Sequence, residues 1–122
     1  MDLSTYKWKH RLFLIFAQSP AETQYKEQLH LLEGTEADFW HRDLLLGKFL
    51  LENSEFDGTR VSAEEATRLR NQLGVAWEKF TVLLVGKDDG EKFRSGDPAS
   101  ADQIFRRIDA MPMRRREMHE RG

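Results

Sequence analysis

The residues best placed to do chemistry form the segment Gln18-Ser19-Pro20-Ala21-Glu22, directly after an apolar run. A hydroxyl or thiol at the start of a helix acts as a nucleophile when the helix dipole or an adjacent base activates it. The Ser19 hydroxyl is such a group, but no histidine lies near it in sequence, although a distant one could approach in space. Because the Ser19-x-x-Glu22 spacing is typical of a capping box, Ser19 is interpreted as a helix N-cap rather than a nucleophile.

Other catalytic and metal-binding patterns are missing from the sequence. The chain has no cysteine, which excludes disulfides, thiolate catalysis and thiolate metal sites. The four histidines are scattered, and His30 with Glu33 supplies too few ligands for a zinc or iron site. No phosphate loop, HExxH motif, nucleophile elbow or pair of catalytic carboxylates occurs. The sequence therefore predicts no catalytic residue, no metal site and no cofactor.

Positive charge gathers at the C-terminal end. Residues 106–122 carry six arginines against three acidic residues, in a chain of net charge −2. Arginines can hold a carboxylate or phosphate through paired hydrogen bonds, but charge runs are more commonly solvated helix ends with intramolecular ion pairs. Nucleic-acid binding is disfavoured by the acidic body and by the absence of interleaved aromatic and basic residues. The candidate binding residues are Arg114, Arg115, Arg116, Lys87 and Arg94.

Strands and helices are predicted from periodicity and cap signals. Strands are expected over residues 12–17, 43–51, 80–85 and 91–95, the last two as a hairpin, with a polar loop over 53–60. Helices are expected to begin near Ser19, at Ser62 and after Asp97-Pro98, and Gly34 and Gly74 supply stops. The result is a mixed sheet of four strands with the order βαβαββα.

The end of the chain is expected to continue the last helix past a break. Pro112 should break or kink that helix, so that residues 112–122 form a basic, helical tail of a single domain spanning 1–122. Met111 and Met113 are expected to dock this segment on the sheet while the three arginines Arg114, Arg115 and Arg116 face outward. The tryptophans Trp8, Trp40 and Trp77 are candidate interface anchors, with core or half-buried packing the favoured interpretation.

Several of these segments resemble a thioredoxin. Residues 73–75, 80–85 and 87–91 resemble the stretch that runs from the second core helix of a thioredoxin through a cis-proline into a strand and hairpin. Residues 11–22 resemble the strand and helix start that normally carry Cys-x-x-Cys. The resemblance implies a thioredoxin-like three-layer α/β/α fold whose redox site is degenerate, because Phe80 replaces the cis-proline and Ser19 lies near the position of the cysteine. Phe80 is expected to be an ordinary trans residue.

A more specific resemblance covers essentially the whole chain. The segments Tyr6-Lys7-Trp8-Lys9, residues 85–88 with 92–95, and residues 108–118 are similar to the bacterial domain-of-unknown-function branch of the P-DUDES superfamily. Vertebrate relatives in that superfamily are extracellular sushi-repeat and matrix-associated proteins. The resemblance implies a thioredoxin/peroxiredoxin-like fold without an established activity, in a family whose bacterial members are often exported.

The sequence as a whole predicts a non-catalytic binding or protein-interaction module with an unidentified protein partner. The alternative is an enzyme of peroxiredoxin-like lineage using non-thiol chemistry, and it is weaker because no nucleophile–base pair is visible. The apolar run at 12–17 is too short for a spanning helix of about 20 residues or a signal-peptide core of about 7–15. A cytoplasmic location is expected if Met1 is the native start, and an exported one if a leader was removed.

Overall fold

The computed structural model describes residues 1–121, with side chains to residue 120, and has a mixed sheet of six strands at its centre. The order across the sheet is β4-β3-β2-β1-β5-β6. β1 pairs in parallel with β2, and every other neighbouring pair is antiparallel. The strands are β1 (Arg11–Phe16), β2 (Leu44–Phe49), β3 (Ser54–Phe56), β4 (Thr59–Val61), β5 (Thr81–Val85) and β6 (Glu91–Ser95).

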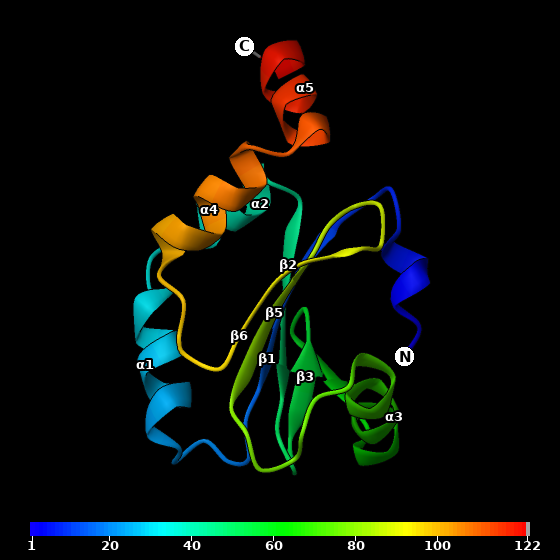
Figure 1. Cartoon of the computed structure of the whole chain (residues 1–122), viewed down its shortest axis with the longest axis vertical. Helices are drawn as coiled ribbons and strands as arrows, with labels where there is room; N and C mark the ends of the chain where they lie inside the picture. The colour runs from blue at the N-terminus through cyan, green and yellow to red at the C-terminus, as the bar shows by residue number, and fades with distance from the viewer. Residues whose placement is uncertain (122) are drawn as a thin grey trace.

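Helices cover both faces of this sheet (Figure 1). One face packs against α1, α2 and α4, and contributes Phe13, Ile15 and Leu84 to that core. The other face packs against η1 and α3, with Leu14 and Leu83 among its core residues. The bounds are η1 (Leu3–Tyr6), α1 (Thr23–Leu31), α2 (Glu36–His41), α3 (Ala63–Leu73), α4 (Ala101–Asp109) and α5 (Pro112–Arg121).

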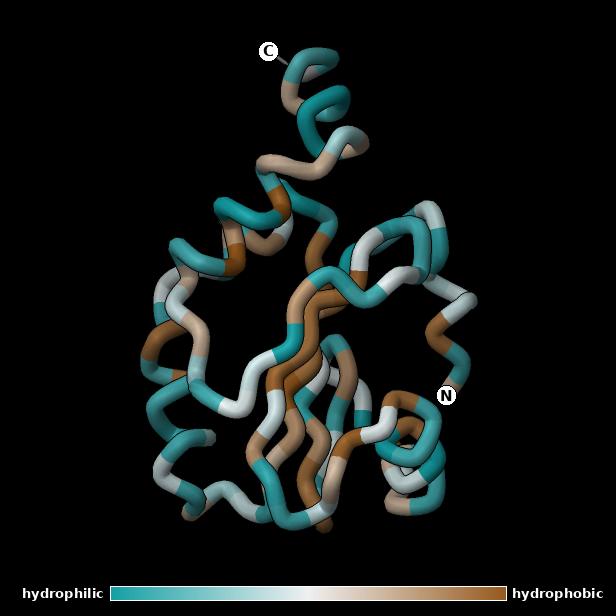
Figure 2. Tube along the Cα trace, in the orientation of Figure 1, coloured by the Kyte–Doolittle hydropathy of each residue, from teal (hydrophilic) through white to brown (hydrophobic). Residues whose placement is uncertain are grey.

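β1 is the central strand, as its continuous apolar run predicts. All six of its residues are buried, and successive side chains enter opposite cores because strand side chains alternate between faces. Figure 2 shows the hydrophobic residues concentrated on the central strands and mostly hydrophilic residues on α5. The thioredoxin-like α/β/α arrangement is therefore confirmed.

The number of strands was predicted wrongly. Residues 53–60, expected to be a polar loop, contain the hairpin of β3 and β4, which raises the sheet from four strands to six. Asp57 and Gly58 have φ angles of 50° and 80°, the positive values that a tight two-residue hairpin turn requires. Phe56 and Val61 bury their side chains in the core, which stabilises this short hairpin.

The structure has one helix more than expected, and another helix begins at a different residue. α2 was not predicted, because its six residues are too short to show a helical period. α1 begins at Thr23 with Glu22 as its N-cap, so Ser19 is not the cap and the prediction of a Ser19–Glu22 capping box is wrong. The Glu22 carboxylate instead accepts a hydrogen bond from the Gln18 N–H at 2.9 Å.

The caps predicted at both ends of α3 are confirmed, whereas α1 ends at Leu31, before Gly34, and α4 is capped by Ser100 rather than opened by Asp97-Pro98. Ser62 accepts from the Glu65 N–H at 3.2 Å, and α3 ends at Gly74, whose φ of 66° lies in the left-handed region. The last helix breaks before Pro112, and its continuation α5 lies beyond the end of α4 (Figure 1). Gly122, the last residue of the predicted tail, lies outside the described residues.

Candidate functional site

The region that corresponds to a thioredoxin active site lies at the carboxyl end of β1. Register pairs Phe16 with Thr81, which brings Phe80 to the same end of the sheet as Ala17 and Gln18. Phe80 is buried in the core and its peptide bond is trans, as is every other described bond. With no cysteine in the chain, this region has no thiol redox site.

Ser19 forms a local turn at this end of the sheet. It is exposed, and its hydroxyl accepts a hydrogen bond from the Ala21 N–H at 3.2 Å. Pro20 and Ala21 are exposed beside it, in the turn that precedes α1. This arrangement supplies neither a helix cap nor a general base for the hydroxyl.

The corrected role of Ser19 predicts a contrast between two serines. Ser19→Ala is expected to lower the free energy of unfolding by less than about 0.5 kcal/mol, since an exposed turn hydrogen bond contributes little. Ser62→Ala is expected to cost about 1 kcal/mol because it removes a true N-cap. Urea denaturation of both variants measures the difference. Equal losses would contradict the assigned roles.

Arg70 lies beneath the same end of the sheet and was missed by sequence analysis. Its side chain is 0% exposed, and Nη2 donates to the carbonyls of Ala17 at 2.7 Å and Phe49 at 3.1 Å. The guanidinium lies over the rings of Phe16 and Trp77, 5.4 Å and 4.7 Å from their centroids. Burial lowers the pKa of Arg70, against the opposing charge of Glu22. The guanidinium thus joins the ends of β1 and β2.

A buried ion cluster occupies the opposite end of the sheet, and we name it the Glu117 cluster after the α5 carboxylate at its centre. Glu117 accepts from Arg11 at 3.1 Å through each of its two oxygens. Lys87 donates to Glu117 at 2.7 Å and to Asp43 at 2.8 Å. Arg11 is 0% exposed and Lys87 is 8% exposed. Lys87, a predicted binding residue, is therefore held in intramolecular ion pairs.

Arg114 belongs to the same cluster. Its Nε donates to Asp109 at 3.1 Å, Nη1 donates to the His41 carbonyl at 2.9 Å, and Nη1 lies 3.8 Å from Glu117. The side chain is buried, so the expectation that it faces outward is wrong. The reason is positional: Arg114 and Glu117 are three residues apart and share one face of α5.

The carboxylates of this cluster are held ionised. Burial raises the pKa of Glu117, but hydrogen bonds from Arg11 and Lys87 outweigh burial and leave that pKa below its ordinary value. The pKa of Asp109 is likewise lowered, with burial opposed by hydrogen bonds from Arg42 and Arg114. The cluster therefore favours the charged state at neutral pH and attaches α5 to β1 and to the β5–β6 turn.

The other predicted residues lie on different surfaces. Arg115 and Arg116 are exposed on α5, where their binding role stays a prediction. Arg94 forms an ion pair with Glu91 at 2.8 Å and donates to the carbonyls of Leu73 and Gly74 at the end of α3. The predicted candidates therefore do not converge on one site.

Trp8 and Trp40 differ from the favoured expectation of core or half-buried packing, whereas Trp77 is largely covered. Trp40 is 76% exposed, Trp8 59% and Trp77 37%. The alternative interpretation, in which these tryptophans anchor an interface, stays a prediction. Met111 is partly buried against the core, consistent with the predicted docking.

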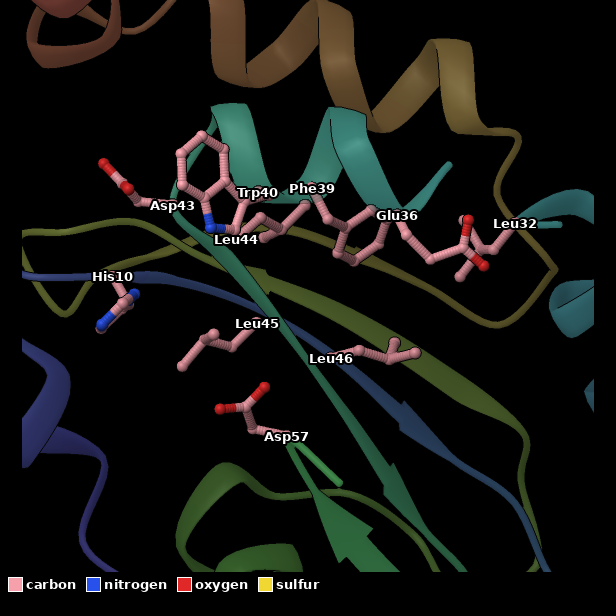
Figure 3. A pocket seen from close by; sticks show the side chains of 10 residues that line it. All are labelled: His10, Leu32, Glu36, Phe39, Trp40, Asp43, Leu44, Leu45, Leu46 and Asp57. Carbon is pink, nitrogen blue, oxygen red and sulfur yellow. The ribbon is translucent and has the colours of Figure 1, made fainter. Parts of the chain in front are cut away.

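A cleft lies along the free part of the β2 edge, and Figure 3 shows its lining. β3 pairs with β2 at Gly47 and Lys48, and the Leu46 carbonyl accepts from the Asp57 N–H at 2.9 Å, so within the described residues no strand flanks Leu44 and Leu45 on that side. The cleft has a volume of about 350 Å³. Its lining, which defines the β2-edge cleft, is His10, Leu32, Glu36, Phe39, Trp40, Asp43, Leu44, Leu45, Leu46 and Asp57.

The cleft runs along the strand edge itself. Leu44 and Leu46 belong to one core and Leu45 to the other, yet all three line the cleft. In Figure 3 the α2 side chains Trp40 and Glu36 lie on one side of β2 and Asp57 on the other. The short helix α2 and the β3–β4 turn thus form the two walls of the cleft. Neither element was predicted from the sequence.

The charges in the cleft are mostly negative. Glu36 and Asp57 are exposed and form no ion pair with the described residues, whereas Asp43 pairs with Lys87. The Nδ1 atom of His10 is buried without a hydrogen-bond partner among them. No set of three or more His, Asp or Glu side chains in the described part of the chain is placed to hold a metal ion. The arrangement suits binding of an apolar group next to a cation.

None of the helices within residues 1–121 has both the length and the hydropathy of a membrane span.

Comparisons with known proteins agree with this fold. Coiled-coil domain-containing protein 80 from Danio rerio is 31% identical over 133 residues, covering 95% of this chain but 15% of that protein. The chain thus corresponds to a small part of this much longer relative. Reduced 2-Cys peroxiredoxin from Plasmodium vivax superposes with a TM-score of 0.65 at 14% identity, over 100% of this chain and 86% of the peroxiredoxin. That likeness shows a peroxiredoxin-like fold.

A family model gives the most direct assignment. It describes a domain of unknown function and matches residues 2–117, which include every strand and the Glu117 cluster. The chain belongs to the DUF4174 family.

Proposed function

We propose that this chain is a non-catalytic protein-interaction module that binds an extended, basic and apolar segment of a partner protein in the β2-edge cleft. The observation that carries the proposal is the β2 edge at Leu44 and Leu45, which no strand of the described residues covers beyond the Leu46 carbonyl and its hydrogen bond from Asp57, and which an exposed tryptophan flanks. Extended peptides bind such edges by adding a strand, with backbone hydrogen bonds for affinity and side-chain pockets for specificity.

The walls of the cleft suit the side chains of such a segment. Trp40 offers a large ring that is 76% exposed, and Leu45 and Leu46 are half-buried beside it. Exposed tryptophans at the rim of an apolar cavity are frequent anchors of protein interfaces. The cavity is small, which favours individual side chains of a peptide over a folded surface.

The acidic side chains of the cleft favour a positively charged partner segment. Glu36 and Asp57 lie on opposite walls and have no cationic partner among the described residues. A lysine or arginine next to an apolar residue in the bound segment would pair with one of them, and the acids would repel an acidic segment. The module therefore favours a segment in which apolar and basic residues alternate.

The test uses a fluorescein-labelled peptide that alternates valine and lysine, and a control peptide that alternates valine and glutamate. We expect saturable anisotropy with the lysine peptide, and amide chemical-shift changes centred on Leu44, Leu45 and Leu46. Trp40→Ala should weaken binding by about tenfold or more, as at an interface hot spot. Asp57→Asn should weaken it by about threefold, as for one exposed ion pair.

Asp89→Asn is the matched control. Asp89 is exposed, has a φ of 70° like the positive φ of Asp57, and lies in the β5–β6 turn outside the cleft. Its replacement should leave binding unchanged. Equal binding of the two peptides, or binding that survives Trp40→Ala, would refute the proposal, as would no saturable binding of the lysine peptide.

A further inference from the structure

A second and larger cavity lies where α4 meets α5, at the end of the sheet that holds the Glu117 cluster. Its volume is about 710 Å³, within the range of small-molecule sites. We name it the α4–α5 cavity and define it by Trp8, Arg107, Met111 and Met113 with the β5–β6 turn. It shares none of its lining with the β2-edge cleft.

One wall of this cavity is apolar. Met111, Pro112 and Met113 come from the α4–α5 junction, and Trp8 lines the same cavity from the segment before β1. The Trp8 N–H donates to the Lys87 carbonyl at 2.6 Å, which holds its backbone against the β5–β6 turn. Methionine side chains adapt to ligands of different shape, and tryptophan supplies a broad apolar surface. This wall suits a hydrocarbon or aromatic body.

The rest of the lining is mainly basic. Lys92 pairs with Asp88 at 2.7 Å, and Glu117 and Asp43 neutralise Arg11 and Lys87. These contacts leave one basic side chain of the lining uncompensated.

Arg107 is that uncompensated group. It is exposed, and it contacts no carboxylate among the described residues. Its guanidinium lies 4.3 Å from the centroid of the Phe93 ring, which leaves its N–H groups available to a ligand. Arg106, the preceding residue, instead pairs with Asp102 at 2.9 Å.

A buried donor adds a second, independent observation. Arg11 lines the cavity, is 0% exposed, and its Nε has no hydrogen-bond partner within the described residues. Buried donors in folded proteins are normally satisfied, so an orphaned one calls for an acceptor. The first turn of α5 also borders the cavity and contains no acidic residue, which leaves the positive end of its dipole uncompensated.

We propose that the α4–α5 cavity binds a small amphipathic anion, with its carboxylate near Arg107 and Arg11 and its hydrocarbon body against Trp8 and the methionines. A monoanion fits because one cation is uncompensated. This site goes beyond the proposed function: its ligand is a small molecule of opposite charge to the peptide, at a separate cavity.

The probe is octanoate, titrated into the folded protein while the indole N–H signal of Trp8 is followed by NMR. We expect a saturable shift of that signal and no comparable shift with octylammonium, which has the same hydrocarbon body and the opposite charge. Arg107→Gln should weaken octanoate binding by about tenfold, the loss of one charge-assisted hydrogen bond. Met111→Gln should also weaken it by making the apolar wall polar.

Arg106→Gln is the matched control, since it removes a neighbouring arginine of α4 that does not line the cavity. It should bind octanoate as the unchanged protein does, and thermal melts of the two arginine variants should coincide within a few degrees. The proposal is overturned if octanoate gives no saturable shift, if octylammonium binds equally well, or if the two arginine variants behave alike. Peptide binding at the β2-edge cleft should persist with octanoate bound, so the two proposals can fail separately.

Discussion

Glu117→Gln is expected to lower the free energy of unfolding by about 3 kcal/mol, the lower end of the range for breaking a buried ion pair. Glutamine keeps the shape of the side chain but leaves Arg11 and Lys87 without their shared carboxylate. Arg11 is 0% exposed, so little water compensates its charge once the carboxylate is lost. The lower end applies because α5 lies at the surface, where water can reach the cluster if the helix shifts. Urea denaturation measures the loss.

The same variant should change the acid limb of the stability profile. The pKa of Glu117 is lowered in the folded state, against about 4.3 for an unperturbed glutamate. A group with a lowered folded pKa binds more protons when unfolded, so its contribution is complete above the unfolded pKa and disappears as the pH falls through the folded pKa. Unfolding free energy should therefore fall below about pH 4.3, and less steeply in Glu117→Gln, while Asp109 preserves part of the slope.

Glu120→Gln serves as the control, because Glu120 is an exposed residue of the same helix. Its stability should match the unchanged protein within about 0.5 kcal/mol. If the two glutamate variants unfold together, or if their acid limbs coincide, Glu117 does not hold α5 in place.

Arg70→Ala is expected to be as damaging, with a loss of about 3–5 kcal/mol. Truncation removes a fully buried side chain from the core and leaves a cavity beside Phe16 and Trp77. It also leaves the Ala17 carbonyl without its donor, and an unsatisfied buried carbonyl costs about 1–3 kcal/mol. Loss of the guanidinium should loosen the carboxyl ends of β1 and β2 together.

Arg70→Met separates the two causes. Methionine fills most of the volume and removes a buried charge whose Nε and Nη1 lack hydrogen-bond partners among the described residues. We expect it to recover all but about 1 kcal/mol of the loss, since buried ionic groups are often replaceable by apolar ones. Equilibrium unfolding of both variants gives the comparison. A methionine variant as unstable as the alanine variant would mean that the carbonyl hydrogen bonds, not the packing, dominate.

Local signals predicted much of this fold. The continuous apolar run of β1, the Ser62 cap and the Gly74 stop each depend on a few neighbouring residues, and the structure contains all three. Short elements were not predicted, because a three-residue strand and a six-residue helix are too short to show a recognisable hydrophobic period. The Asp57-Gly58 pair did carry a usable hairpin signal that was interpreted as a loop.

The candidate sites depend on contacts between distant residues. Arg11 and Glu117 are separated by 106 positions, and nothing in the local composition of either segment indicates the other. Arg114 was therefore predicted to face solvent although it is buried. Arg70 had a weak signal, since it lies four residues after Ala66 on the inward face of α3. An arginine on an otherwise apolar stripe indicates a buried guanidinium.

The long sequence separation between Arg11 and Glu117 also bears on the order in which the parts of the molecule fold. Joining residues 106 positions apart confines almost the whole chain in one loop, and the entropy of closing that loop opposes the contact until other structure has brought its ends together. We therefore expect the sheet to pair first and α5 to dock last. An interaction absent from the folding transition state acts on the rate of unfolding. We accordingly expect loss of the Glu117 cluster to raise the rate of unfolding and to leave the rate of folding almost unchanged.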